Sequence, residues 1–191
     1  MTTTVARRAL NARQIETRQK LMDAAVELTG STTDWGMRDV ARQAGVSPAT
    51  AYTYFSSREH LLAEVYAAWV NRLSDRLRQS PPRGSTPADR VRNVMARAVQ
   101  GVEESPGLAQ ALTLALATAD PAVAVVRPEI DGAFRDWFDL ALGADELPDR
   151  AAIARILELT MYAAMLSHAH GTIDAPELRT TLEDATRVLL G

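Results

Sequence analysis

The sequence of 191 residues contains no cysteine, which excludes disulfide bonds and zinc sites built on thiolates. It also lacks any stretch near the roughly 18 consecutive apolar residues that a membrane span needs. The first eight residues, which end in Arg7 and Arg8, contain no apolar run of signal-peptide length. With a composition that is 47% hydrophobic and 24% charged, the sequence predicts a globular, cytoplasmic protein without a membrane partner.

Signals for β-strands are missing as well. No segment alternates between apolar and polar residues with a period of two, and the hairpin dipeptide Asn-Gly does not occur. Apolar residues instead recur at helical spacing, and prolines stand near the starts of four segments, where a helix tolerates them. The sequence predicts an all-α protein whose longer helices cover residues 13–29 (ended by Gly30), 58–78, 88–104, 106–118, 122–142, 148–171 and 176–190.

Charge is distributed unevenly along the chain. The net charge of −3 argues against a nucleic-acid partner, yet residues 1–60 carry eight Lys and Arg against six Asp and Glu, while residues 61–191 carry thirteen against eighteen. An excess of positive charge at one end favours contact with phosphate there. We interpret residues 1–12 as a flexible basic arm, which either keeps the protein soluble or reaches into a minor groove.

A helix-turn-helix pattern lies between Gly36 and Phe55. Val40, Ala41 and Ala44 recur at helical spacing, and a glycine, Gly45, follows as a residue that suits a helix exit. Ser47 is then an N-cap, and Pro48 occupies the first helical position, where its missing N–H costs nothing. A helix, a tight corner and a second short helix form the motif whose second helix enters the DNA major groove.

Four pieces of sequence in this region carry a family resemblance: Arg38-Asp39-Val40-Ala41, Ala44-Gly45-Val46-Ser47, Thr50-Ala51-Tyr52-Thr53-Tyr54-Phe55 and Ser57-Arg58. In this order, within residues 13–70, they resemble the TetR family of bacterial regulators. The resemblance implies a three-helix DNA-binding head over residues 13–57 and a helical ligand-binding and dimerisation domain over residues 58–191. The chain departs from the family at Gly36, where a Thr or Ser usually caps the helix.

The motif also predicts which side chains contact DNA. Ala49 and Thr50 lie in the first turn of the second helix, Thr53 shares their face, and Arg38 is a candidate for a bidentate contact to guanine. The resemblance implies base contacts from Arg38, Pro48, Ala49, Thr50, Tyr52 and Thr53, and phosphate contacts from Tyr52, Tyr54 and Arg58. Two alternatives stay open: Arg38 pairs within the protein or with solvent, and Tyr54 packs into the core with Phe55.

The last quarter of the chain predicts a homodimer. Residues 151–166 are apolar nearly all round, so that helix needs cover both from its own domain and from a partner. The final helix has a matching apolar stripe. We expect an interface that includes Leu157, Ala164, His168, Leu182, Ala185, Val188 and Leu189. The alternative is a central helix buried within a monomer.

The same domain contains Met and aromatic residues at helical spacing, which suit either a core or a pocket for an apolar ligand. The candidate ligand-binding residues are Met95, Val99, Leu108, Leu112, Leu116, Phe134, Trp137, Phe138, Met161, Tyr162 and Met165. Residues 105–113 and 187–191 resemble, loosely, the branch of the family that represses sterol and fatty-acid catabolism. That resemblance implies a steroid, an acyl-CoA or a similar lipid as effector.

Nothing in the sequence predicts catalysis. His168 and His170 are two residues apart and so point to different helix faces, unlike the i, i+4 pair of a helical zinc site. No phosphate-binding glycine loop or nucleophile elbow occurs. We expect no cofactor, no metal and no enzyme, but a repressor that leaves a near-palindromic double-stranded DNA operator when a small apolar molecule binds. Two alternatives are a regulator of the same fold that responds to a protein partner or to nothing, and a dimeric protein whose head no longer binds DNA.

Overall fold

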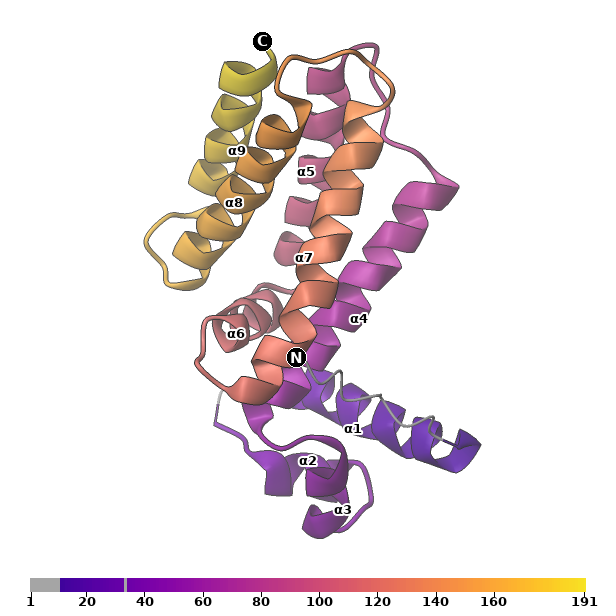
Figure 1. Ribbon diagram of the computed structural model, residues 1–191. Coiled ribbons are helices and arrows are strands. Elements are labelled where there is room, and N and C mark those ends of the chain that lie inside the picture. The colour runs from indigo at the N-terminus through magenta and orange to yellow at the C-terminus, as the bar shows by residue number, and fades with distance from the viewer. Residues whose placement is uncertain (1–10, 33) are drawn as a thin grey trace. The chain divides into compact units, whose positions relative to one another are not determined.

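The computed structural model describes residues 11–32 and 34–191, and the secondary structure in these ranges is entirely helical (Figure 1). The basic residues Arg7 and Arg8 lie outside the described residues. The helices are α1 (Ala12–Ser31), α2 (Met37–Gln43), α3 (Pro48–Tyr54), α4 (Arg58–Gln79), α5 (Pro87–Glu104), α6 (Pro106–Leu116), α7 (Pro121–Leu142), α8 (Arg150–Ala169) and α9 (Ala175–Leu190). The all-α prediction is confirmed.

The chain divides into two compact units, one ending at Arg58 and the other comprising Glu59–Gly191. In the first unit, which we call the head, α1 packs against α2 and α2 packs against α3. The head core is built largely from small and medium side chains, which lets three helices approach closely. Its buried apolar residues are Leu21, Met22, Ala24, Ala25, Trp35, Met37, Val40, Ala41, Ala51 and Phe55.

The corner between α2 and α3 is a Schellman motif. Gly45 has a φ of +67°, and its N–H donates to the carbonyl of Arg42 at 3.2 Å. The N–H of Val46 donates to the carbonyl of Ala41 at 2.9 Å, so the open end of α2 is satisfied. The Ser47 side chain then accepts from the N–H of Thr50 at 3.0 Å and starts α3. The predicted roles of Gly45, Ser47 and Pro48 in this corner are confirmed.

Helix starts in the second unit follow the same local chemistry. Thr86 and Asp89 form a capping box at α5, and Asp174 and Glu177 form one at α9. Proline occupies the first or second helical position of α5, α6, α7 and α9. Each of these helices therefore begins where a local signal marks its start.

Several helix ends lie one or two residues from the sequence prediction, and two of them show the reason. Gly30 does not end α1, which continues to Ser31 and closes with a bond from the N–H of Thr32 to the carbonyl of Leu28 at 2.9 Å. The helix expected from Pro148 begins two residues later, after Asp149 adopts a left-handed φ of 54°. Differences of one or two residues reflect how weakly single residues bias a helix end.

The second unit is a helical bundle. In it α5 packs against α7 and α9, α8 packs against α7 and α9, and α6 lies against α8 and α5. Figure 1 shows α8 and α9 side by side as the last hairpin of the chain. Large side chains connect α4 to α7: the indole N–H of Trp137 donates to the Ser74 hydroxyl at 2.6 Å in the buried core. Trp137, Phe138, Leu142, Leu157, Met161 and Leu178 are each at most 2% exposed.

Within the described ranges no single helix is long and apolar enough to cross a membrane. Among the described helices, α6 and α7 together have the length and apolar composition of a membrane span, but the two are bent by 112° relative to each other.

The left-handed corner gives a stability prediction. Gly45→Ala should destabilise the protein by about 1–2 kcal/mol, because a Cβ makes this backbone conformation unfavourable. Gly30→Ala is the matched control: Gly30 is helical and no atom lies within 4 Å of the position that a Cβ would take, so alanine there should stabilise by up to about 1 kcal/mol. Thermal unfolding followed by circular dichroism measures both. Equal shifts for the two variants would contradict the proposed role of the corner.

Candidate nucleic-acid interface and ligand cleft

One face of α3 is turned outward. Ala51 and the following Phe55 are 0% and 1% exposed, whereas Tyr52 is 53% exposed and Pro48, Ala49 and Thr53 are also exposed. The burial of Ala51 and Phe55 fixes the helix by its inner side. The opposite side therefore presents a small, mostly uncharged surface of methyl groups, hydroxyls and one phenol.

The hydroxyl groups on this face have internal partners. Thr53 donates its hydroxyl to the carbonyl of Ala49 at 3.0 Å, and the Thr50 and Ser47 hydroxyl oxygens lie 2.8 Å apart. Because the Thr53 proton is used within the helix, its oxygen offers only lone pairs to the outside. It can thus accept a hydrogen bond from a base amino group, while its methyl group suits apolar contact.

Arg38 stands on the first turn of α2 and is exposed. It has no hydrogen-bond or ion-pair partner among the described residues. The neighbouring Asp39 is instead occupied by two other groups, since it accepts from the N–H of Gly36 at 3.0 Å and pairs with Arg42. The bond from Gly36 and the charge of Arg42 hold the pKa of the Asp39 carboxyl below its ordinary value. Gly36, the N-cap residue, has no side chain to cap α2. The Asp39 carboxylate in the first turn binds the Gly36 N–H instead.

The two residues at the end of the motif are partly withdrawn from solvent. Tyr54 is half-buried next to the fully buried Phe55, so its side chain is partly packed and partly open to solvent. Arg58 is also half-buried, and its guanidinium lies 4.4 Å from the centre of the Trp35 ring. This cation–π contact fixes the position of the Arg58 charge. Sequence reasoning missed the part played by Trp35, which no helical period identifies because it precedes α2.

A cleft opens in the second unit among α4, α5, α6 and α8. It contains about 490 Å³ of empty space, counted with the part open to solvent at its mouth. Its lining residues are Tyr66, Trp69, Gly101, Val102, Glu104, Ser105, Leu108, Ala109, Leu112, Thr113 and Met165.

Three of the predicted ligand-binding residues line this cleft, namely Leu108, Leu112 and Met165. Met95 and Val99 instead line a second hollow, between α5 and α9. The other six lie apart from the cleft: Leu116, Phe134, Trp137, Phe138 and Met161 are at most 3% exposed in the core, and Tyr162 is half-buried. The structure thus divides the predicted set between a cleft and a packed core.

Aromatic residues from α4 form one wall of the cleft. The Tyr66 and Trp69 rings stack with their centres 5.7 Å apart, and Phe134 meets Tyr66 edge-on at 6.4 Å. Burial raises the pKa of the Tyr66 phenol, with Tyr162 adding to the shift, so this phenol stays neutral. A methyl group on Gly101 would come within 2.4 Å of the Trp69 ring. The glycine therefore lets the indole lie directly against α5.

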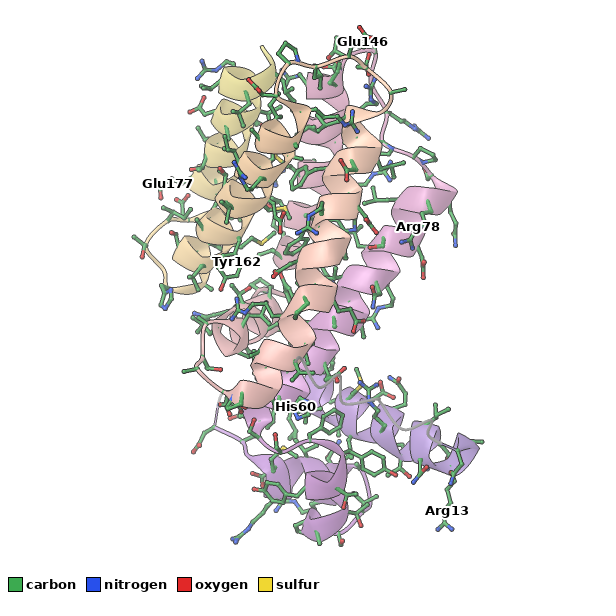
Figure 2. All side chains as sticks on the ribbon, in the orientation of Figure 1. Arg13, His60, Arg78, Glu146, Tyr162 and Glu177 are labelled. Carbon is green, nitrogen blue, oxygen red and sulfur yellow. The ribbon has the colours of Figure 1, made fainter. Side chains whose placement is uncertain are left out.

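Tyr162, labelled in Figure 2, belongs to a polar contact between α7 and α8. The Arg127 guanidinium donates to the Tyr162 hydroxyl at 3.4 Å and to the carbonyl of Leu116 at the end of α6. One arginine on α7 therefore holds α6 and α8 in register. Sequence reasoning did not find it, because an arginine in an amphipathic helix ordinarily faces solvent.

The residues expected at a dimer interface differ in how much of their side chains is exposed to solvent. Leu157, Ala164 and Leu182 are at most 4% exposed and face the core of their own unit. Val188 is 74% exposed, while His168, Ala185 and Leu189 are half-buried. The side chains at the first three positions are already covered by the chain itself, and the interface expected there stays a prediction.

A set of exposed and half-buried residues on α8 and α9 includes Ala185 and Val188 of the expected interface, and we call this set the outer stripe. On α8 its members alternate in steps of four and three, the spacing of a helix–helix seam. The outer stripe consists of Ala152, Ile156, Leu159, Ala163 and Leu166 on α8 and Thr181, Ala185 and Val188 on α9. Ile156 and Leu159 are 42% and 60% exposed.

The two histidines near the end of α8 contact backbone carbonyls. The Nδ1 atom of His168 lies 3.1 Å from the carbonyl oxygen of Ile173, and Nδ1 of His170 lies 2.9 Å from that of Leu166. Within the ranges that the structure describes, no three His, Asp or Glu side chains gather in a way that could hold a metal ion.

Two family profiles match the chain. Residues 21–65 match the bacterial regulatory proteins of the tetR family, and residues 84–189, more than half of the chain, match the tetracyclin repressor-like C-terminal domain. The chain belongs to the TetR family. It is therefore a DNA-binding transcriptional regulator with a helix-turn-helix head, and not an enzyme. TetR regulators bind DNA operators and act as dimers.

Curated relatives span most of this TetR-family chain. An HTH-type transcriptional regulator of Mycobacterium tuberculosis is 34% identical over 176 residues, which make up 90% of this chain and 79% of the relative. The HTH-type transcriptional repressor KstR of Rhodococcus jostii is 27% identical over 181 residues, or 93% of this chain and 84% of the relative.

Solved structures have the same fold. A TetR transcriptional regulator from Rhodococcus sp. RHA1 superposes with a TM-score of 0.80 at 27% identity, over 93% of this chain and 97% of that one. FadR of Thermus thermophilus, a TetR-family repressor solved with lauroyl-CoA, superposes with a TM-score of 0.67 at 19% identity, over 90% and 92% of the two chains. At that identity the second likeness is one of fold alone.

Proposed function

We propose that this TetR-family protein is a repressor that binds a near-palindromic operator as a homodimer and leaves it when an amphipathic or apolar effector enters the cleft. The observation that carries the proposal is the outward face of α3, which is fixed from behind by Ala51 and Phe55 and left uncovered within its unit. A short helix with a small, exposed outer face fits the major groove.

Each exposed side chain of the motif then has a distinct part. Arg38 donates to a guanine edge, Thr50 and Thr53 contact bases through methyl groups and lone pairs, and Pro48 and Ala49 approach the groove floor. Tyr52, Tyr54 and Arg58 contact phosphates and set the register of the head on DNA. Among the residues expected to contact bases, only Arg38 brings a full charge with several free donors, so it is the strongest candidate for specificity.

Dimerisation uses the outer stripe of α8 and α9. Its large apolar side chains Ile156, Leu159 and Val188 are 42%, 60% and 74% exposed, and exposed apolar surface marks interaction sites. Small residues at Ala152, Ala163 and Ala185 allow close approach of helices. Two copies related by a two-fold axis would place their α3 helices one turn of DNA apart, about 34–36 Å, or a multiple of it.

Effector binding shifts a population. A ligand that binds one arrangement of the two heads more tightly than another draws the dimer toward the arrangement that it prefers. If that arrangement does not fit consecutive major grooves, affinity for the operator falls. Operator DNA must then weaken effector binding by the same factor. The cleft favours this regulator over one with a filled core that responds to a protein partner or to no effector.

The base contact of Arg38 is tested by substitution. Arg38→Ala should weaken binding to the operator by about 1–3 kcal/mol and relax the preference for guanine at one position. Electrophoretic mobility shifts at fixed salt, on DNA from upstream of the protein's own gene, measure both. Arg42→Ala is the control, since Arg42 is on the same helix but already pairs with Asp39. Unchanged affinity and base preference in Arg38→Ala would rule out this role.

The dimer surface is tested at Leu159. Leu159→Glu should dissociate the dimer, with a cost of about 3–5 kcal/mol, because a carboxylate would be buried without a partner. Sedimentation velocity over a concentration series measures the association. Val125→Glu is the control, since Val125 on α7 is 79% exposed and lies outside the outer stripe. A Leu159→Glu protein that still forms dimers as the wild type does would place the interface elsewhere.

The effector cleft is tested by filling it. Leu108→Trp should leave operator affinity within about 1 kcal/mol of wild type, since it occupies space in the cleft and not on the head. It should abolish the loss of DNA binding that the wild-type protein shows with a panel of acyl-CoA thioesters and sterols. Fluorescence anisotropy of labelled operator DNA measures the release. A wild-type protein that ignores the whole panel would count against a lipid effector.

A further inference from the structure

A second, polar cleft adjoins the apolar one. It lies between the C-terminal parts of α4 and α5, and it contains about 1010 Å³ of empty space, counted with its opening to solvent. Gly101 and Glu104 line both clefts, so the two share a border on α5. On one side of that border stand Leu108, Leu112 and Met165; on the other side the lining is mostly polar and charged.

Two arginines give the polar cleft its positive charge. Arg76 on α4 is exposed and has no hydrogen-bond or ion-pair partner among the described residues. Arg97 on α5 is half-buried, and its Nη1 donates to the carbonyl of Ser80 at 2.7 Å, which fixes the side chain. A guanidinium has five N–H donors, so this bond leaves Arg97 free to bind an anion as well.

One acid lies at the border of the two clefts. The Glu104 carboxylate accepts from the Gln100 amide at 2.8 Å. Glu104, Tyr66 and Trp69 line the same cleft, and a carboxylate together with aromatic rings can bind a cationic ligand. Trp69, however, is stacked on Tyr66 and lies against Gly101, so the rings do not form an open cage. Two arginines against one carboxylate favour an anion in the polar cleft.

We propose that the effector is an anionic amphiphile whose apolar part occupies the cleft at Leu108, Leu112 and Met165 and whose anionic head binds Arg76 and Arg97. This inference rests on the proposed function, because it names the chemistry of the same effector. The head is a carboxylate or a phosphate, since both present oxygen atoms that a guanidinium binds in pairs. A neutral sterol would use the apolar cleft only and leave both arginines without a ligand.

A charge series with one constant chain tests the inference. Decanoate, 1-decanol and decyltrimethylammonium are titrated into the dimer by isothermal titration calorimetry at pH 8, the two ions below their micelle-forming concentrations and 1-decanol below its solubility limit. Decanoate should bind about tenfold more tightly than 1-decanol, because partly exposed charge pairs add only modestly to binding. Decyltrimethylammonium should bind most weakly. Decanoyl-CoA, which has phosphates in place of the carboxylate, separates the two kinds of head.

Variants assign the preference to the two arginines. Arg76→Gln should remove most of the tenfold difference while 1-decanol binds as before. Arg97→Gln should also remove most of the difference, and Arg97→Lys should restore part of the preference for decanoate. The lysine variant separates the effect of the positive charge from that of the hydrogen bond between Arg97 and the Ser80 carbonyl, just after α4. Arg78→Gln is the matched control, since Arg78 (labelled in Figure 2) is exposed on α4, pairs with Asp75 and does not line the cleft.

Each outcome has a separate meaning. Equal binding of decanoate and 1-decanol, or a preference for the cation, would overturn the anionic head while the apolar cleft of the proposed function stands. A preference for decanoate that survives in both glutamine variants would overturn the assignment to Arg76 and Arg97. No binding of any member of the series, with operator binding intact, would count against the apolar effector itself and so against both.

Discussion

The backbone corner at Gly45 is the constraint on which the DNA-contact surface depends. Its left-handed φ closes α2 through two hydrogen bonds and directs the chain into Ser47, which caps α3. The direction of α3, and therefore the side that faces out, follows from this one turn. Ala51 and Phe55 then fix the inner side by burial. The small polar outer face needs no interaction of its own, because the corner and the inner side already hold it in place.

Local chemistry explains why much of the fold was predictable from sequence. Caps and N-terminal prolines act within one helical turn, so Ser47, Pro48, Thr86 and Pro106 mark helix starts without knowledge of the rest of the chain. Apolar spacing adds a second signal, which can outweigh a local one. It predicted a helix through Pro128, and α7 does continue there, because the burial of its apolar face outweighs one lost backbone bond.

The proposed effector cleft was predictable only in part, because its lining comes from four different helices. Helical spacing identified Leu108, Leu112 and Met165 as inward-facing, but it could not separate them from Phe138 or Met161, which are inward-facing and simply packed. The difference depends on whether another helix fills the space opposite. Trp69 and Gly101 show this: the cleft wall exists because a large ring on α4 meets a residue without a side chain on α5.

The position of α4 in the chain links the proposed effector cleft to the DNA-binding head. Tyr66 and Trp69, one wall of the cleft, belong to the helix that begins at Arg58, four residues after α3 ends at Tyr54. A helix transmits a displacement along its axis more faithfully than a loop, since its backbone bonds resist bending. A ligand that presses on Trp69 therefore acts on the element joined most directly to α3. Coupling also requires that the ligand prefer one of two arrangements, since tight binding to both would shift nothing. The stacked rings of Tyr66 and Trp69, with the indole against Gly101, are the part of α4 on which such a preference would act.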